Sequence, residues 1–287
     1  MKVVLFCGGA GMRLRGYSDD VPKPMVKIGT RPILWHLMKY YAHFGHKDFI
    51  LCLGYKGDCI KDYFLHYDES VSNNFIWSKG GKQIHYLNRD IDDWTITFVE
   101  TGANSNIGER LKAVESYLEG EETFLANYGD GLSDLPLPQM LQTFQQSNAL
   151  AALLLVQPTA SFDIVHSGPN GFVRDISALS CTDIWINGGF FAMRNEIFQH
   201  IQAGEELVRE PFRRLIEKER LLAYKYNGFW QCMDTFKDKQ RLEELNEGPG
   251  PWKVWNHVPA PQSRKGELTS VVSDLPGNGQ GRMQIGP

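Results

Sequence analysis

Short apolar runs alternate with segments of helical periodicity through the first half of the chain, and this alternation constrains the fold more than any other feature. We predict strands for the apolar runs, at residues 3–7, 49–53, 95–99, 123–127 and 150–156. Helices are predicted between them, at residues 33–44, 58–67, 109–118 and 138–146. The first of these has Pro32 in its first turn and Gly45 just past its end, as helices often do. Strands that alternate with helices imply βαβ crossovers, so we expect an α/β protein with a mostly parallel sheet.

The second half of the chain has a more mixed pattern and a distinct end. INGGFFAM at residues 186–193 predicts a strand, and residues 210–219 predict a helix. After residue 256 the chain becomes rich in Gly, Pro, Ser and Gln, a composition that cannot bury enough apolar surface to fold alone. We therefore expect one domain over residues 1–256 and a mobile extension over residues 257–287.

Composition excludes several classes of partner. The net charge is −4, from 30 basic and 34 acidic side chains without a basic block, which does not favour a nucleic-acid partner. No apolar run reaches the 18 or so residues that a membrane-spanning helix needs, so we expect no membrane segment. The five cysteines form no CxxC pair, which favours reduced thiols in a cytoplasmic protein.

Two polar stretches follow predicted strands and carry residue types suited to phosphates and cations. GGAGMR follows the first strand and YGDG follows the fourth, and ligands of such sheets bind beyond the carboxyl ends of the strands. Glycines there can present backbone N–H groups to an anion, or simply make a tight turn. In PKPM, two prolines flank Lys23 and fix the direction of its ammonium group. From the residues alone, a phosphate site and a structural turn remain equally open.

Two familiar phosphate-binding motifs are excluded. The dinucleotide fingerprint GxGxxG would need glycine at position 14, which is Leu14, so an NAD oxidoreductase is not supported. The P-loop would need Gly-Lys-Ser/Thr, but Tyr17 follows Gly16.

The sequence resembles the sugar-nucleotide pyrophosphorylases. The resemblance rests on FCGGAGMRL followed by VPKPMVKIGTRPILWH, and within that superfamily the chain is most similar to the glucose-1-phosphate cytidylyltransferases. Further segments occur in the family's order over residues 1–255, namely DFILCLGYKGDCIKDYF, TGANSNIGERLKAV, YGDG, INGGFF and GFWQCMDTFKDK. The resemblance implies a Rossmann-like nucleotidyltransferase fold with a mostly parallel mixed sheet flanked by helices, and we expect a homo-oligomer.

The resemblance also implies a reaction. A sugar 1-phosphate oxygen attacks the α-phosphorus of a nucleoside triphosphate, CTP in this branch, and pyrophosphate leaves. Positioning and charge neutralisation supply most of the acceleration, with Mg²⁺ bridging phosphates. By resemblance, Asp130 and Asp234 are the metal ligands. From the residues alone, Asp130 could instead form a turn and Asp234 could be the N-cap of the helix that follows.

The remaining site residues are carried over from the same resemblance. Gly8, Gly9, Gly11, Arg13, Lys23, Gly102 and Arg110 are expected to bind the nucleotide, Arg13 and Lys23 as the catalytic contacts to its phosphates. Tyr128, Asn187, Gly188, Gly189 and Trp230 are expected to bind the acceptor. Plainer interpretations remain open: a surface lysine at 23, a solvated helix residue at 110, a glycine bulge at 187–189 and core aromatic residues at 128 and 230.

Two positions depart from the family pattern. Met12 replaces a threonine whose hydroxyl could donate to a phosphate. Ser177-Ala178-Leu179 replaces Glu-Lys-Pro, whose lysine is expected to neutralise the sugar phosphate and whose glutamate is expected to bind sugar hydroxyls. Either Arg174 or a residue near Asp183 substitutes, or the acceptor is not glucose 1-phosphate. A catalytically weak nucleotide-binding regulatory protein is the alternative function, although Arg13, Lys23, Asp130 and Asp234 together favour catalysis.

Overall fold

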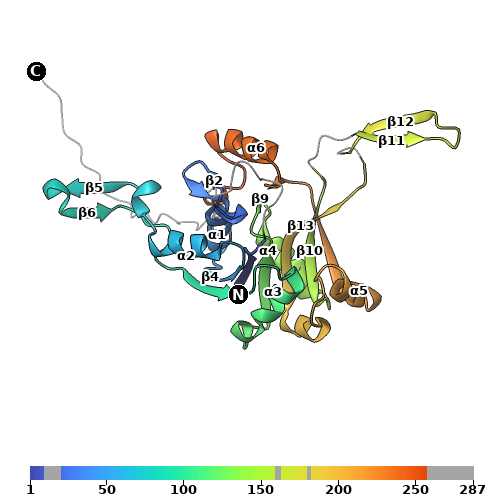
Figure 1. The fold of residues 1–287 in the computed structure, drawn as a ribbon, viewed down its shortest axis with the longest axis horizontal. Helices are drawn as coiled ribbons and strands as arrows, with labels where there is room; N and C mark the ends of the chain where they lie inside the picture. Colours follow the sequence, from blue (N-terminus) through green and yellow to red (C-terminus); the bar gives the residue numbers. More distant parts are fainter. Residues whose placement is uncertain (10–20, 159–162, 180–181, 257–287) are drawn as a thin grey trace, which may run out of the picture. The chain divides into compact units, whose positions relative to one another are not determined.

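The computed structural model describes residues 1–9, 21–158, 163–179 and 182–256 (Figure 1). In these residues a seven-stranded sheet has the strand order β14-β10-β13-β8-β1-β4-β7. The strands are β1 Val3–Phe6, β4 Asp48–Leu53, β7 Thr95–Glu100, β8 Thr123–Asn127, β10 Ala151–Val156, β13 Ile186–Arg194 and β14 Leu221–Tyr226. β1 pairs in parallel with β4 and β8, β4 with β7, and β10 with β14, whereas β13 runs antiparallel to β8 and β10. The predicted mostly parallel mixed sheet is confirmed.

Helices pack on both faces of this sheet. They are α1 Ile33–His43, α2 Gly57–Leu65, α3 Ile107–Ala113, α4 Leu137–Gln146, α5 Glu210–Glu217 and α6 Phe236–Glu247. Side chains alternate between the faces of a strand, so Val3 and Leu5 enter one hydrophobic cluster and Val4 and Phe6 the other. The first cluster includes residues of α1, α4 and α6, and the second includes residues of α3 and α5. The carboxyl end of β1 is therefore held between two buried layers.

The predicted helix at residues 109–118 begins earlier and divides. The Asn106 side chain accepts a hydrogen bond from the Glu109 backbone N–H, and the Glu109 carboxylate accepts one from the Asn106 N–H. This capping box starts α3 at Ile107. The helix ends at Ala113, and a 3₁₀ turn, η5 Glu115–Leu118, completes the segment. The α-helix thus begins two residues before the predicted start at 109 and ends five residues before the predicted end at 118.

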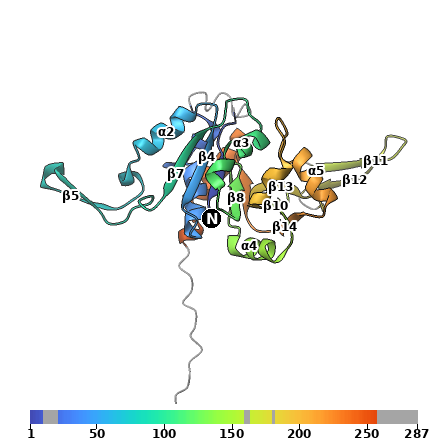
Figure 2. The ribbon, with the colours of Figure 1, turned by 90° about the horizontal axis from the view of Figure 1, so that it is seen from below.

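Short two-stranded pairs complete the fold. They are β2 Lys27–Ile28 with β3 Arg31–Pro32, β9 Gly131–Ser133 with β15 Trp230–Cys232, β5 Phe75–Ser78 with β6 Gln83–Tyr86, and β11 Asp163–Ser167 with β12 Val173–Ala178. The β9–β15 pair lies close to the carboxyl ends of the central strands. The β5–β6 and β11–β12 ribbons extend away from the sheet in opposite directions in both views (Figures 1 and 2).

The end of the described chain is anchored on α1. Trp252 is fully buried, and its Nε1 donates a hydrogen bond to His36 Nδ1 at 3.3 Å. The other imidazole nitrogen of His36 lies 3.0 Å from the Ile28 carbonyl oxygen, so it donates that bond when the ring is neutral. Burial lowers the pKa of His36 to about 4, which keeps the ring neutral. The expected extension at 257–287 lies outside the described residues, and none of the described helices is long and apolar enough to cross a bilayer.

Candidate active site

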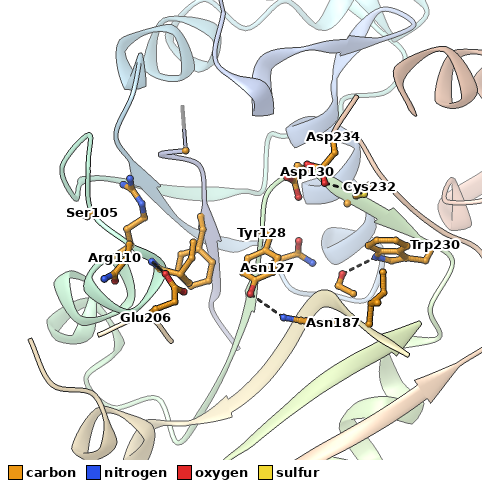
Figure 3. Close-up of a pocket in the computed structure, with 17 residues that line it drawn as sticks. Ser105, Arg110, Asn127, Tyr128, Asp130, Asn187, Glu206, Trp230, Cys232 and Asp234 are labelled. Atoms are coloured by element: carbon orange, nitrogen blue, oxygen red, sulfur yellow. Dashed lines mark hydrogen bonds between the residues drawn. The ribbon is translucent and has the colours of Figure 1, made fainter. Parts of the chain in front are cut away.

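A cavity of about 560 Å³ lies at the carboxyl ends of β1 and β8 (Figure 3). One side is bordered by Gly9 and by the start of α3, and the other by the start of β13 and by Trp230 of β15. Figure 3 shows Arg110 and Glu206 toward one end and Trp230 toward the opposite end, with Asp130 and Asp234 close together between the ribbon segments that carry them. The position agrees with the general rule for ligands of parallel sheets.

Asp130 and Asp234 converge on a single ammonium group. Lys23 Nζ lies 2.5 Å from Asp130 Oδ2 and 2.5 Å from Asp234 Oδ1. Burial acts to lower the pKa of Lys23, but the two adjacent carboxylates outweigh it, so the pKa is raised and the amine is charged. Lys23 begins the 3₁₀ turn η2 Lys23–Met25 directly after Pro22, so its backbone is fixed at the point where its side chain reaches the carboxylates. Lys23 is therefore not an isolated surface lysine.

The β9–β15 pair brings the two aspartates together across more than 100 positions of sequence. Asp130 immediately precedes β9 and Asp234 follows β15 by two positions. In the antiparallel register Cys232 is opposite Gly131, and the Met233 N–H donates to the Asp130 carbonyl at 3.0 Å. Residues that precede one strand and follow its antiparallel partner lie at the same end, so both carboxylates reach Lys23.

The glycine before Asp130 is required by its surroundings. Gly129 has φ of 57°, and a Cβ placed on it would lie 3.0 Å from the Phe6 carbonyl oxygen of β1. Only glycine adopts this left-handed conformation without strain at so close an approach. The chain can therefore turn sharply after β8 and direct Asp130 toward the cavity.

The proposal that Asp234 caps α6 is wrong. The N-cap is Thr235, whose hydroxyl accepts from the Asp238 N–H, while the Asp238 carboxylate accepts from the Thr235 N–H. The Asp234 backbone N–H also donates to Asp238, so the backbone of Asp234 belongs to the capping network while its carboxylate contacts Lys23.

The arrangement of the two carboxylates suits a divalent cation. Two carboxylates already converge on one positive charge, and oxygen ligands are those that hard cations prefer. Among the described residues there is no cluster of three or more His, Cys, Asp or Glu side chains that could hold a metal by itself. A cation here would therefore take its other ligands from water or from a substrate, as Mg²⁺ commonly does.

Arg110 is buried rather than solvated. Its side chain is in α3, only 2% of the residue is exposed, and its guanidinium donates to the carbonyls of Leu53 and Gly8 and to Thr101 Oγ1. These three acceptors lie at the carboxyl ends of β4, β1 and β7. A Cβ on Gly8 would lie 2.0 Å from the guanidinium, so the glycine provides the space that the arginine occupies. Arg110, which itself lines the cavity, thus ties together the ends of β4, β1 and β7.

The expected acceptor residues form one connected wall. Asn187 Nδ2 donates to the Tyr128 hydroxyl at 3.1 Å, and Trp230 Nε1 donates to the Gly188 carbonyl at 2.8 Å. Gly189 has φ of 76°, and a Cβ there would meet the Tyr128 ring at 2.6 Å. The register of β13 against β10 shifts in this region, so the glycines do form an irregularity in the strand. Residues 187–189 therefore form a strand irregularity, and Asn187 and Gly188 of the same segment also line the cavity.

Glu206 and Asn127 line the cavity although no sequence motif predicts them. Glu206 lines the cavity from the segment before α5, and its carboxylate accepts from the Ile107 N–H at 3.4 Å. Gly108 allows this approach, because a Cβ there would lie 2.2 Å from the Glu205 carbonyl oxygen. Asn127 Oδ1 is buried and lacks a hydrogen-bond partner within the described part of the chain. The sequence signals that could indicate them are Gly108, a glycine inside a helix, and Asn127 itself, a polar residue at the end of a buried strand.

Several predicted residues do not join this site. Gly11, Met12 and Arg13 lie outside the described residues. Ser177 and Ala178 are in β12 and do not line the cavity. Of the expected substitutes, Arg174 does not line it, since its guanidinium lies against Gly168, and the residues near Asp183 that do line it, Ile186 and Asn187, carry no positive charge.

Comparison with known proteins identifies the family. The sequence matches the nucleotidyl transferase family over residues 2–231. It is 36% identical over 258 residues to a probable glucose-1-phosphate cytidylyltransferase of Bacillus subtilis (strain 168), and 39% identical over 259 residues to the glucose-1-phosphate cytidylyltransferase of Salmonella typhimurium. Each match covers 89% of this chain and all of the relative.

Solved structures agree on the fold. HddC from Yersinia pseudotuberculosis superposes with a TM-score of 0.60 at 20% identity, covering 85% of this chain and 99% of that one. A UDP-glucose pyrophosphorylase complexed with UDP-glucose gives 0.62 at 15% identity, covering 86% and 98%. The chain therefore belongs to the nucleotidyl transferase family, as a nucleotidyltransferase similar to the glucose-1-phosphate cytidylyltransferases.

Proposed function

We propose that this protein transfers CMP from CTP to a sugar 1-phosphate or a related phosphorylated acceptor and releases pyrophosphate. The observation that carries the proposal is the convergence of Asp130, Lys23 and Asp234 at a cavity beyond the ends of β1 and β8. A triphosphate and a phosphorylated acceptor are both anions, and this reaction needs no protein nucleophile. Charge neutralisation and alignment are what these three residues can supply.

We propose that Asp130 and Asp234 hold Mg²⁺ when the substrates bind. The two carboxylates fit an oxygen-liganded cation, since they already converge on the ammonium group of Lys23. Bound Mg²⁺ supplies charge neutralisation and orientation of phosphate oxygens. Lys23, fixed by its prolines beside the same carboxylates, contacts the phosphates and keeps its proton, because its raised pKa holds it charged.

We propose that the nucleotide and the acceptor bind toward opposite ends of the cavity. We propose that Gly8, Gly9 and Gly102 let the backbone approach the nucleotide, and that Arg110 holds this end in shape through the Gly8 carbonyl. Gly11 and Arg13 are proposed as nucleotide contacts from the sequence resemblance alone. CTP is proposed because the relatives that are 36% and 39% identical to this chain are named as a probable glucose-1-phosphate cytidylyltransferase and a glucose-1-phosphate cytidylyltransferase.

Tyr128, Asn187, Gly188, Gly189 and Trp230 are proposed to form the acceptor wall. Their hydrogen bonds to one another fix the wall in place before any ligand binds. Asn127 Oδ1, which has no hydrogen-bond partner among the described residues, offers a further acceptor to a bound hydroxyl or water. No lysine appears among the residues that line the described cavity, so we propose that glucose 1-phosphate is a poor acceptor.

The chain is also proposed to form a homo-oligomer, with residues 1–256 as its catalytic domain and 257–287 as a separate extension. Ser177-Ala178-Leu179 stands where the resemblance implies Glu-Lys-Pro for binding the acceptor. This difference favours one other candidate function, a catalytically weak protein that binds nucleotide for regulation.

A pyrophosphate-release assay with each of the four ribonucleoside triphosphates and dTTP against a panel of phosphosugars, with and without Mg²⁺, tests the proposal. Magnesium-dependent release with CTP and at least one acceptor supports it. Nucleotide binding with no release for any pair contradicts it and supports the regulatory candidate. The Asp130→Asn variant, which removes one charge with little change of shape, is the matched control for background release.

A further inference from the structure

Glu206 brings a carboxylate to one end of the cavity without a cationic partner among the described residues. It lies toward the same end as Arg110, opposite Trp230 (Figure 3). Its Oε2 accepts from the Ile107 N–H at 3.4 Å, whereas Oε1 has no donor within the described part of the chain. No described lysine, arginine or histidine forms an ion pair with it. One carboxylate oxygen at this end is therefore left for a ligand.

The segment that carries Glu206 is fixed on both sides. The Glu205 carboxylate accepts from both terminal nitrogens of Arg214, and Leu207 is fully buried. The Glu206 backbone N–H donates to the Glu210 carboxylate at 3.2 Å, in the first turn of α5. A side chain held between two anchored neighbours keeps its position before a ligand binds.

The other polar side chains at this end of the cavity are already used within the protein. The Ser105 hydroxyl donates to the Thr101 carbonyl at 2.5 Å. Both amide atoms of Asn106 are hydrogen-bonded to backbone groups. Both terminal nitrogens of Arg110 donate to protein acceptors. At this end, Glu206 is therefore the described side chain best placed to accept a hydrogen bond from a bound molecule.

Charge decides which part of a nucleotide can lie against Glu206. Burial raises the pKa of Tyr128 to about 12, and the charge of Glu206 acts in the same direction, so this carboxylate faces the phenol that lines the cavity. A carboxylate repels phosphate oxygens, whereas Lys23 attracts them at the two aspartates, apart from Glu206 in Figure 3. The group that suits the Glu206 end is therefore uncharged and donates hydrogen bonds, as a base or a ribose does.

A carboxylate distinguishes cytosine from the other pyrimidines. Ionised Glu is an acceptor only. Cytosine has an amino group at the position where uracil and thymine have the O4 carbonyl oxygen, and carboxylates accept from this amino group in known recognition of cytosine. A site that accepts from an N–H group rejects the analogue that lacks it, because two acceptors then face each other.

We propose that Glu206 Oε1 accepts a hydrogen bond from the exocyclic amino group of cytosine and thereby selects CTP over UTP and dTTP. Glu206 is then a specificity-determining residue that takes no part in the transfer of the nucleotidyl group. The inference rests on the proposed function, since it needs a nucleoside triphosphate in the cavity with its base toward this end. It adds a physical cause for a base preference that is otherwise taken from relatives.

Calorimetric titration with CTP and with UTP, in the presence of Mg²⁺ and without an acceptor, tests this inference by affinity alone. The wild type should bind CTP about 10-fold or more tightly than UTP. In Glu206→Gln the Ile107 N–H retains the amide oxygen, so the amide nitrogen faces the base and donates to O4 of uracil. The preference for CTP should therefore fall to within about 3-fold or reverse. Glu119→Gln, which removes the same charge at an exposed position, is the matched control and should keep the wild-type ratio.

Two further titrations separate the base from the ribose. Glu206→Ala should weaken CTP by about 10-fold without weakening UTP, because the attraction to the amino group and the repulsion of O4 are lost together. The affinity ratio of CTP to dCTP should be the same in the wild type and in Glu206→Gln. A change in that ratio with an unaltered ratio of CTP to UTP would assign Glu206 to the ribose and overturn the inference.

Two other results would also overturn it. The first is a wild type that binds CTP and UTP equally, and the second is a Glu206→Gln variant that keeps the wild-type preference. In both cases a triphosphate still binds, so the proposed nucleotidyl transfer remains standing. A wild type that binds none of these nucleotides would contradict the proposed function together with this inference, so the two failures can be told apart.

Discussion

Protonation of His36 should couple the stability of this domain to pH. The buried imidazole accepts from Trp252 Nε1 at one nitrogen and faces the Ile28 carbonyl at the other. A second ring proton would therefore point at an N–H donor. Burial is the main cause that lowers the pKa of His36 to about 4; the nearby charges are Lys253 and Arg31, which act in the same direction, and Glu243, which opposes them.

The direction and size follow from proton linkage. In the unfolded chain His36 has the ordinary histidine pKa of about 6.5, so between pH 6.5 and pH 4 the unfolded state binds more protons than the folded state. The free energy of unfolding therefore falls as the pH falls through this window. At about 1.4 kcal/mol per pKa unit, the loss is about 2 kcal/mol at pH 5 and about 3 kcal/mol at pH 4.

Urea unfolding of the wild type and of His36→Gln at pH 7.5 and pH 5 measures the contribution of His36. Carboxylates that titrate in the same range affect both proteins alike, so their contribution cancels in the difference. The variant is less stable at pH 7.5, but its deficit should shrink by about 2 kcal/mol at pH 5, because glutamine does not titrate. His66→Gln, at an exposed histidine, is the matched control for replacing a histidine by glutamine. Parallel pH dependences for the wild type and His36→Gln would refute the reasoning.

The remaining predictions concern the site. Asp130→Asn should fold normally and lose about 100-fold or more in turnover; magnesium-dependent rates near wild type would remove Asp130 from the metal site. CTP should be used in preference to dTTP, UTP and ATP in competition assays, and equal rates with dTTP would contradict this. Glucose 1-phosphate should react about 10² to 10⁴-fold more slowly than the true acceptor, from two lost charge-assisted hydrogen bonds, and turnover above about 1 s⁻¹ would show that another group replaces them. Arg110→Lys should raise the KM for nucleotide more than it lowers kcat, because three strand ends lose their common donor; an unchanged KM would count against that positioning role.

Much of the sheet could be predicted because its signals are local. The strand at residues 123–127 is β8 Thr123–Asn127, and α4 and α5 fall within a few residues of their predicted bounds. The start of α3 was missed although its signal is also local: Asn106 followed three positions later by Glu109 is a capping box. The placement of Asp130 and Lys23 near one another could be expected from the end of β8 and the two prolines.

Other features depend on pairings that no local pattern shows. The convergence of Asp234 on Asp130 needs the antiparallel pairing of β9 with β15, which joins segments about 100 residues apart. The burial of Arg110 depends on Gly8, whose missing side chain leaves the space for the guanidinium. The β5–β6 ribbon was not predicted, because its alternating residues are exposed on both faces and no buried partner defines a strand.

The positions that depart from the pattern expected by resemblance lie in an exposed ribbon. Ser177 and Ala178, which stand where the resemblance implies Glu and Lys, are in β12, and they do not line the described cavity. The proposed acceptor wall is instead made of uncharged side chains: Asn187 donates to the Tyr128 hydroxyl, and Trp230 donates to the Gly188 carbonyl. Among the described residues beside this cavity, Lys23 already faces two carboxylates and the Arg110 guanidinium already donates to the Leu53 and Gly8 carbonyls. We therefore propose that acceptors are distinguished mainly by their hydroxyl groups and shape, so a screen that varies the sugar at constant phosphate will discriminate among candidates better than one that varies the phosphate.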